Sequence, residues 1–271
     1  MKISNADGGG RGRFSGADQG CPEVGTYLER LAYAGSGRPS LQALQALHLA
    51  HLRTVPFENL DVHGKVPVVL DVEGLFRKVV GRRRGGFCYE LNGLFVWLLE
   101  ALGFAVERLS ARVLDGEGMA GPPFDHLALR VTIGGEHWLA DVGFGDGFER
   151  PLRLCPGVIQ AQSDREYRLR HEGQEWLVEE RRSTAGWRGL YWVGEQPRRL
   201  EEFTDRCHYH QTAQSSPFTR GRLCTRATPR GRLTLSGRRL IEADRGERRE
   251  RELGSEDEVR QALREHFAIV V

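Results

Sequence analysis

Residues 126–142 read HLALRVTIGGEHWLADV, an alternation of apolar and polar side chains interrupted only by two glycines. An alternation with a period of two predicts β-strands, and Gly134-Gly135 is a favoured two-residue hairpin turn. A turn there pairs Ile133 with Glu136 and so fixes the register of the hairpin. In this register one face is apolar, and its members are Leu127, Leu129, Val131, Ile133, Trp138, Ala140 and Val142.

His126 and Asp141 share the other face of this hairpin. Asp141 lies opposite Ala128, which makes it the diagonal neighbour of His126 at about 7 to 8 Å between backbones. An imidazole and a carboxylate can close that gap to a hydrogen bond. Taken alone, the pair is equally well explained as a surface cross-strand contact that stabilises the sheet by about 0.2 to 1 kcal/mol.

Upstream of the hairpin the apolar side chains recur with a helical period. Thr26 begins a capping-box signature for a first helix. Ser40 is predicted to cap a second helix and Asp71 a third. A fourth helix is predicted to end at Gly103, because residues spaced i, i+3, i+4, i+7 and i+11 are apolar, namely Leu91, Leu94, Phe95, Leu98 and Leu102. Residues 21–103 are therefore predicted to be a helical bundle.

The rest of the chain divides into three further segments. Short alternating pieces continue to residue 193, which predicts a strand-rich region over residues 104–196. Residues 197–271 give a mixed signal, with a strand candidate at 232–235 and a helix candidate at 255–267. Residues 1–20 hold six glycines and few apolar side chains, so they are predicted to be a disordered extension. The fold class expected from these periods is α+β.

Composition excludes several classes of protein. The 39 Lys and Arg against 37 Asp and Glu give a net charge of +2, too small an excess to coat nucleic acid. A membrane span is not expected, because residues 94–106, the most apolar segment, contain Glu100 and Gly103 and fall short of the roughly 20 residues required. Five scattered cysteines without a CxxC pair, and no apolar leader near Met1, predict a cytoplasmic protein.

Cys88 lies where two glycines, Gly85 and Gly86, give way to the fourth predicted helix. Backbone N–H groups and the helix dipole favour an anion at a helix start, so the pKa of this thiol is expected to fall from about 8.5 toward the 3.5 to 7.5 of reactive cysteines. A cysteine with a His–Asp pair is an arrangement for acyl chemistry, in which the thiolate attacks and the imidazole moves the proton. The alternative is that Cys88 is a small buried apolar residue.

Three motifs resemble the arylamine N-acetyltransferase family, in the same order and at similar spacing. They are residues 55–60 (VPFENL), 84–92 (RGGFCYELN) and 139–145 (LADVGFG). The resemblance implies a helical bundle at 21–103, a central antiparallel β-barrel at 104–196 and an α/β lid at 197–271, which agrees with the changes of period. It also implies a cysteine-protease-like arrangement of a triad.

The catalytic triad implied by the resemblance is Cys88, His126 and Asp141. The activity implied is a ping-pong reaction without a metal, in which acetyl-CoA acylates the cysteine and an arylamine or hydrazine nitrogen then takes the acetyl group. A role in the metabolism of foreign amines is expected for such an enzyme.

The resemblance also implies supporting residues around this triad. Glu58 and Arg84 match an ion pair that holds the catalytic loop. Phe57 and Phe144 match aromatic residues of the acceptor pocket, although from the residues alone both phenylalanines are assigned to the core.

Donor contacts are implied in the lid, where Tyr209, Thr212 and Ser215 match positions that contact coenzyme A. Arginine side chains in the same region suit phosphate groups, and their alternative role is solubility. They are Arg220, Arg222, Arg226, Arg230 and Arg232.

Other readings of the sequence stay open. The same triad with water as the acceptor gives a cysteine hydrolase, and related enzymes of this fold release polyketide chains by forming an amide. Cys207, His208 and His210 suggest a zinc site, but on an extended segment they do not converge and a fourth ligand is missing nearby. A pure binding module is a further alternative, in which Cys88 reacts like an ordinary thiol.

Overall fold

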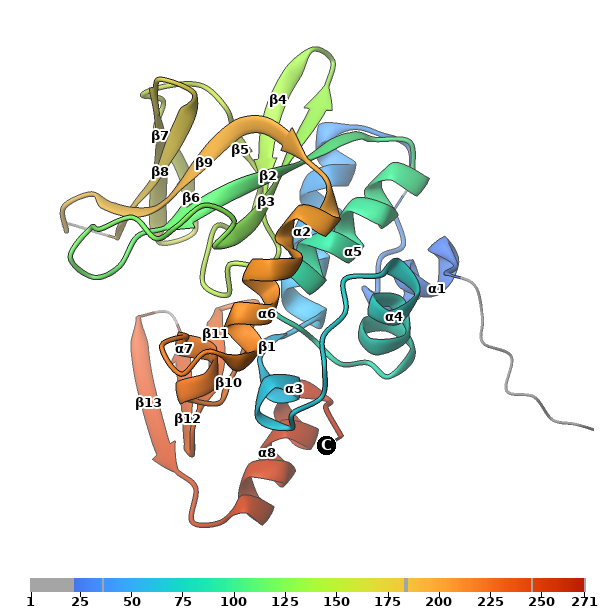
Figure 1. Ribbon diagram of the computed structural model, residues 1–271, viewed down its shortest axis with the longest axis vertical. Coiled ribbons are helices and arrows are strands. Elements are labelled where there is room, and N and C mark those ends of the chain that lie inside the picture. The colour runs from blue at the N-terminus through green and yellow to red at the C-terminus, as the bar shows by residue number, and fades with distance from the viewer. Residues whose placement is uncertain (1–21, 36, 183–184, 245, 271) are drawn as a thin grey trace, which may run out of the picture.

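The computed structural model describes residues 22–35, 37–182, 185–244 and 246–270. The disorder predicted for residues 1–20 lies outside these ranges. The described chain has three parts: a group of helices, a nearly closed antiparallel barrel, and a second sheet with a helix packed on it (Figure 1). The α+β fold class predicted from the sequence is confirmed.

The helical part contains α1 (Val24–Arg30), α2 (Leu41–Thr54), α3 (Leu60–His63), α4 (Val72–Phe76), the π-helical segment η1 (Arg77–Gly81) and α5 (Cys88–Ala101). Ser40 and Asp71 cap α2 and α4 as predicted, since their side chains accept backbone N–H groups at 3.1 and 2.7 Å. The capping box at Thr26 is wrong, because α1 begins at Val24 and the Thr26 hydroxyl donates to Glu23 instead.

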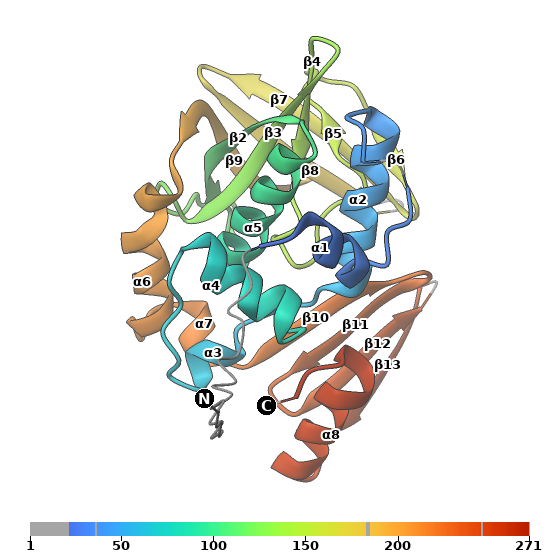
Figure 2. The same cartoon turned by 90° about the vertical axis from the view of Figure 1, so that its right-hand side faces the viewer.

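Helix α5 lies at the centre of the molecule, beneath β2 and β3 of the barrel and beside α1 and α2 (Figure 2). Leu91, Leu94, Phe95 and Leu98 on this helix are fully buried. A helix that is apolar on most of its surface must be enclosed on all sides, and the barrel provides one of those sides.

Eight strands form the barrel: β2 (Ala105–Val113), β3 (His126–Ile133), β4 (Glu136–Ala140), β5 (Leu152–Arg153), β6 (Gln160–Gln162), β7 (Arg165–Glu172), β8 (Glu175–Arg182) and β9 (Arg188–Arg198). Their order is β5-β4-β3-β2-β9-β8-β7-β6. Side chains bridge the seam, because Gln160 accepts the N–H of Arg153 at 2.8 Å and Gln162 accepts the N–H groups of Glu149 and Arg150. These bonds satisfy some of the backbone hydrogen-bonding groups at the two edges of the eight-stranded sheet.

The register predicted for the β3–β4 hairpin is confirmed. Ile133 pairs with Glu136 and Leu129 pairs with Ala140. The two faces have separate cores: the predicted apolar face packs against the helices, whereas Ala128 and Leu139 lie in the barrel interior. The face that carries His126 and Asp141 is therefore buried rather than exposed to solvent.

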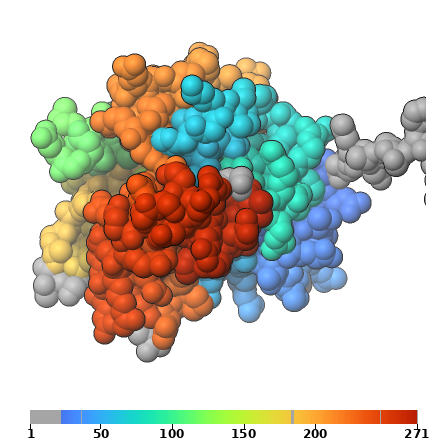
Figure 3. Space-filling model, turned by 90° about the horizontal axis from the view of Figure 1, so that it is seen from below, coloured from blue at the N-terminus to red at the C-terminus, as the bar shows by residue number. Residues whose placement is uncertain are grey.

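The C-terminal part contains η2 (Leu200–Phe203), α6 (Thr204–Thr212), α7 (Pro217–Arg220), β10 (Leu223–Thr228), β11 (Gly231–Ser236), β12 (Arg239–Asp244), β13 (Glu247–Glu252) and α8 (Glu256–Phe267). The predicted strand and helix candidates correspond to β11 and α8. Figure 3 shows α8 and its neighbours covering the middle of the lower face.

One strand of the C-terminal sheet comes from the helical part of the chain. β1 (Phe57–Glu58) pairs with β10, with Phe57 opposite Thr225. The sequence did not indicate this strand, because two residues are too few to show a period. In the described ranges, none of the helices is both long enough and apolar enough to cross a membrane.

Candidate active site

Two glycines bring the loop before α5 into close contact with its surroundings. A Cβ on Gly85 stands only 1.9 Å from the carbonyl oxygen of Pro56, and one on Gly86 meets the Glu90 side chain at 2.6 Å. Glu90 also accepts the backbone N–H of Phe87 at 3.1 Å and so caps the helix start. The Gly-Gly pair therefore exists because only glycine fits there, and it places Cys88 at the first turn of α5.

Cys88 lies in the core where the helices pack against the barrel. The residue is only 3% exposed. Burial raises the pKa of the Cys88 thiol well above its ordinary value, and the Leu127 N–H opposes this only in part. The lowered pKa expected from the helix start is therefore wrong, because the helix begins inside the protein. A thiolate at this position needs a nearby group that takes its proton.

His126 and Asp141 form the hydrogen bond that the hairpin register predicted. The distance from His126 Nε2 to Asp141 Oδ2 is 2.7 Å, and both residues are 2% exposed. Burial alone raises the pKa of Asp141, but His126, the Asn92 amide and the Gly143 N–H together lower it below its ordinary value. Asp141 is therefore a carboxylate that accepts the Nε2 proton, which leaves the lone pair on Nδ1.

Asn92 connects the cysteine helix to the hairpin. It lies one helical turn after Cys88, and its amide donates to the carbonyl of Leu127 at 2.6 Å and to Asp141 Oδ1 at 2.8 Å. Its carbonyl oxygen accepts the N–H of Val142 at 2.9 Å. The helix that begins at Cys88 is therefore joined through Asn92 to Asp141 and to Leu127, which directly follows His126 in the chain.

Two further residues that the sequence analysis missed hold Asp141. The hydroxyl of Tyr191 donates to Asp141 Oδ2 at 3.0 Å, and the backbone N–H of Asp141 donates to His48 Nε2 at 3.0 Å. The sequence offered a signal for His48, because a polar residue here lies on the apolar face of α2 beside Leu47. Tyr191 gave none, since its strand reads like any other strand of the barrel.

A pH dependence of stability follows from His48. Burial lowers its pKa to about 4, so the folded protein keeps it neutral while the unfolded chain titrates near 6.5. The unfolded state binds more protons between these values, so stability falls as the pH falls from about 6.5 to about 4. Between pH 7 and pH 5 we expect the free energy of unfolding to fall by about 2 kcal/mol more in the wild type than in His48→Gln, measured by urea denaturation. An equal change in the free energy of unfolding between pH 7 and pH 5 in the two proteins contradicts this prediction.

Gly143 packs against the cysteine helix. A Cβ on this residue stands 2.8 Å from both Cys88 Cα and Asn92 Nδ2. We expect Gly143→Ala to cost about 1 to 3 kcal/mol of stability and to slow turnover at least about tenfold, because Asp141 and the helix must move apart. Thermal melting and steady-state kinetics measure both effects. Gly116→Ala is the matched control, since a Cβ there meets nothing within 4 Å.

A buried network of charges lies beside the loop that precedes α5. Arg84 pairs with Glu58 at 2.8 Å and with Asp61 at 2.8 Å, and Lys78 pairs with Asp61 at 2.8 Å and with Glu90 at 2.7 Å. Burial raises the pKa of Glu90 to about 7, although Lys78 opposes the shift. The ion pair between Glu58 and Arg84 is thus part of a larger cluster that also holds the cap of α5.

Of the two candidate acceptor aromatics, Phe144 lies in the loop after β4 and Phe57 lies on β1. The ring of Phe144 lies edge-on to His126 at 5.4 Å between centroids and 5.1 Å from Tyr191. Phe57 is 7% exposed, and a Cβ added at Gly145 would lie 3.5 Å from its ring. Phe144 is half-buried, so it is the more accessible of the two aromatic residues.

Tyr209, Thr212 and Ser215 lie in and just after α6. The hydroxyls of Tyr209 and Ser215 bond each other at 2.8 Å, and Thr212 donates to the carbonyl of His208. Tyr209 and Ser215 therefore form one polar group at the end of the helix. Of the arginines considered for phosphate, four bind groups of the chain itself, namely Arg222, Arg226, Arg230 and Arg232.

The segment considered for zinc is helical. On α6, His210 bonds Asp125 at 3.1 Å and Ser216 at 3.0 Å, while Gln211 donates to the sulfur of Cys207. Across the residues the structure describes, no cluster of three or more His, Cys, Asp or Glu side chains is arranged to hold a metal ion. Burial raises the pKa of Cys207 to about 12, which disfavours the thiolate that zinc requires.

Two cavities lie away from this site. One of about 630 Å³ is lined by residues 66–69 together with Asp61, Lys78 and Glu90 of the buried charge network. The other, of about 230 Å³, lies beside Phe124. Cys88, His126 and Asp141 line neither cavity.

Comparison with known proteins identifies the family of this chain. A family model described as N-acetyltransferase matches residues 40–271. A protein of Mycolicibacterium smegmatis named arylamine N-acetyltransferase is 40% identical over 225 residues, which cover 80% of this chain and 81% of that protein. The chain belongs to the arylamine N-acetyltransferase family.

Solved structures of arylamine N-acetyltransferases share the whole fold. The enzyme from Salmonella typhimurium matches with a TM-score of 0.87 at 32% identity, over 91% of this chain and 90% of that one. The Mycobacterium marinum enzyme in complex with CoA matches with a TM-score of 0.85 at 33% identity, over 91% and 93% of the two chains. The helical bundle, barrel and second sheet are therefore the architecture of the family.

Proposed function

We propose that this chain transfers an acetyl group from acetyl-CoA, through a thioester on Cys88, to the nitrogen of an arylamine or arylhydrazine. Cys88 is the nucleophile, His126 moves the proton and Asp141 orients the imidazole. One observation carries the proposal: Asn92, one helical turn after Cys88, donates to the same Asp141 carboxylate that bonds His126 at 2.7 Å, so one hydrogen-bonded group joins the cysteine helix to the His–Asp pair.

In the first half-reaction, His126 takes the thiol proton and the Cys88 sulfur attacks the acetyl carbonyl. The bond between the carbonyl carbon and the sulfur of coenzyme A breaks, and His126 returns the proton to the departing thiolate. Because burial disfavours an isolated thiolate at Cys88, the proton must move to the imidazole as the sulfur becomes charged. Asp141 stabilises the imidazolium that forms.

In the second half-reaction, the amine nitrogen attacks the thioester carbonyl. His126 accepts the proton from nitrogen, the bond from carbon to the Cys88 sulfur breaks, and the thiol is restored. Transfer rather than hydrolysis requires that water be kept from the thioester while the amine is admitted. Phe57 and Phe144 are proposed to contact the aromatic ring of the acceptor.

The donor is proposed to bind beside α6, where Tyr209, Thr212 and Ser215 supply hydroxyl groups. The CoA complex of the Mycobacterium marinum relative supports a coenzyme A donor. Glu58 and Arg84 are proposed to hold the catalytic loop. A cytoplasmic location and a role in the metabolism of foreign amines stay predictions.

The decisive experiment mixes the protein with acetyl-CoA alone and measures its intact mass. A gain of one acetyl group that an arylamine then removes, with formation of the amide, supports the proposal. Loss of the acetyl group to water at the same rate with or without amine indicates a hydrolase. Acylation only by a carrier-bound acyl thioester indicates amide-forming release of a polyketide chain. Absence of any acyl-enzyme contradicts a thioester mechanism.

A further inference from the structure

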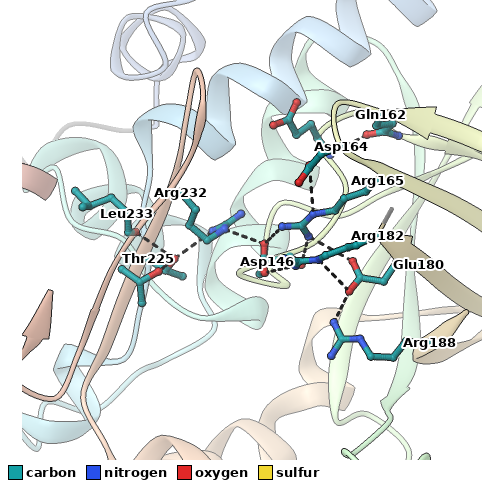
Figure 4. Close-up of polar contacts among 12 residues, drawn as sticks. Asp146, Gln162, Asp164, Arg165, Glu180, Arg182, Arg188, Thr225, Arg232 and Leu233 are labelled. Carbon is teal, nitrogen blue, oxygen red and sulfur yellow. Dashed lines mark hydrogen bonds and ion pairs between the residues drawn. The ribbon is translucent and has the colours of Figure 1, made fainter. Parts of the chain in front are cut away.

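Asp146 is a carboxylate on which arginines from two parts of the molecule converge (Figure 4). Its Oδ1 binds Arg165 at 2.7 Å and Arg232 at 2.9 Å, and its Oδ2 binds Arg182 at 2.8 Å. Burial alone raises the pKa of Asp146, but the three arginines lower it to about 2, so the residue stays charged. Arg165 and Arg182 belong to β7 and β8 of the barrel, and Arg232 belongs to β11 of the C-terminal sheet.

Asp146 lies in the loop that carries the candidate acceptor aromatic Phe144. Gly145, which separates the two residues, has φ of +85°, so the backbone turns sharply between Phe144 and Asp146. A Cβ added at the same Gly145 would lie 3.5 Å from the ring of Phe57, so the loop passes close to this ring. Fixing the Asp146 carboxylate therefore fixes the backbone that lies between the two aromatic residues.

Arg232 reaches the other side of the site as well. Its guanidinium donates to Thr225 Oγ1 at 3.2 Å, and Thr225 on β10 is the pairing partner of Phe57 on β1. The side chain of Arg232 is 16% exposed and that of Asp146 is 43% exposed, so the guanidinium is largely covered while the carboxylate reaches the surface. One guanidinium thus joins the strand beside Phe57 to the loop of Phe144.

We propose that Asp146 and Arg232 are positioning residues that determine acceptor specificity, because their ion pair sets the separation of Phe57 and Phe144. The barrel arginines hold the Phe144 loop to the barrel, and Arg232 holds it to the sheet that carries Phe57. This inference rests on the proposed function, since it concerns what sets the width of the acceptor pocket in that same site. Loss of the ion pair between Asp146 and Arg232 is expected to widen the space between the two rings, which favours larger aromatic amines over small ones.

The test compares Asp146→Asn and Arg232→Met with the wild type, using aniline and 2-aminofluorene as a small and a large acceptor. In a ping-pong reaction kcat/KM for acetyl-CoA reports acylation alone, and kcat/KM for the amine reports the second half-reaction alone. We expect the ratio of kcat/KM for 2-aminofluorene to that for aniline to rise at least about fivefold in both variants. The value for acetyl-CoA is expected to stay within about twofold.

Asp164→Asn is the matched control, because Asp164 belongs to the same cluster and contacts Arg165 at 3.9 Å but is 77% exposed and does not bind the loop. It is expected to leave both acceptors unchanged. The double variant is expected to shift the ratio no more than either single variant, since both remove one bridge. Arg232→Lys keeps the charge but cannot bind Asp146 and Thr225 at the same time. It is expected to show about half of the rise in the acceptor ratio, so it tests the proposal even if Arg232→Met fails to fold.

An equal loss with both acceptors, an unchanged ratio, or additive effects in the double variant overturns the proposal. The wild-type protein is first tested for an acetyl-enzyme. Failure at that step overturns the proposed function itself, whereas an acetyl-enzyme with an unchanged acceptor ratio overturns only the role of Asp146 and Arg232.

Discussion

Cys88→Ser is expected to form no acetyl-enzyme and to reduce acetyl transfer by at least about 10⁴-fold. A serine hydroxyl is far less acidic than a thiol, so the imidazole cannot take its proton at neutral pH in the way proposed for the sulfur. Burial already raises the pKa of the native thiol, so the site is not expected to deprotonate the still less acidic serine hydroxyl. Intact-mass measurement after exposure to acetyl-CoA checks the first expectation, and arylamine acetylation kinetics check the second.

Cys155→Ser serves as the control, because Cys155 is half-buried in a loop of the barrel and belongs to neither the hairpin nor α5. It is expected to gain one acetyl group as the wild type does. An acetyl group on the Cys88→Ser protein, bound stoichiometrically, removes Cys88 from the mechanism.

Asp141→Asn is expected to keep the fold and to lower kcat by about 10⁴-fold. The carboxylate accepts the Nε2 proton of His126, which keeps the lone pair on Nδ1 and stabilises the imidazolium. An asparagine of the same size fills the space, but it favours the other tautomer and carries no charge. The acylation rate is measured by rapid mixing with acetyl-CoA, and the fold is followed by circular dichroism.

Tyr191→Phe separates this effect from a general disturbance of the site. It removes one hydroxyl from Asp141 Oδ2 and leaves the bond to His126 in place. We expect a loss of no more than about tenfold, since one neutral hydrogen bond contributes about 1 kcal/mol. Equal losses in the two variants show that packing around Asp141, rather than its charge, sets the rate.

Much of the local structure was predictable, because it depends on neighbours in the sequence. Gly134-Gly135 fixed the hairpin register, and the side-chain oxygens of Ser40 and Asp71 fixed two helix starts. The register in turn predicted the contact between His126 and Asp141, since a side-chain period of two leaves no choice of face. The family resemblance supplied the expectation that Cys88 joins them.

Features that depend on residues distant in sequence were missed. The strand β1 was not predicted because it pairs with β10, which is far away in the sequence, and no local pattern marks two residues as a strand. The pKa of Cys88 was predicted in the wrong direction, because a helix dipole is a local property whereas desolvation depends on what covers the thiol. Asn92, His48 and Tyr191 emerged as supports of Asp141 only once the helices met the barrel.

The sequence by itself therefore determined several of the helices and strands, the hairpin register and the chemical groups that the site contains. Only the tertiary structure decided that these groups are buried, which side chains hold them, and how Asp146 links the barrel to the C-terminal sheet. The physical reason is the range of the interactions. Backbone periodicity and capping act over a few residues, whereas desolvation and ion pairing depend on atoms that folding alone brings together.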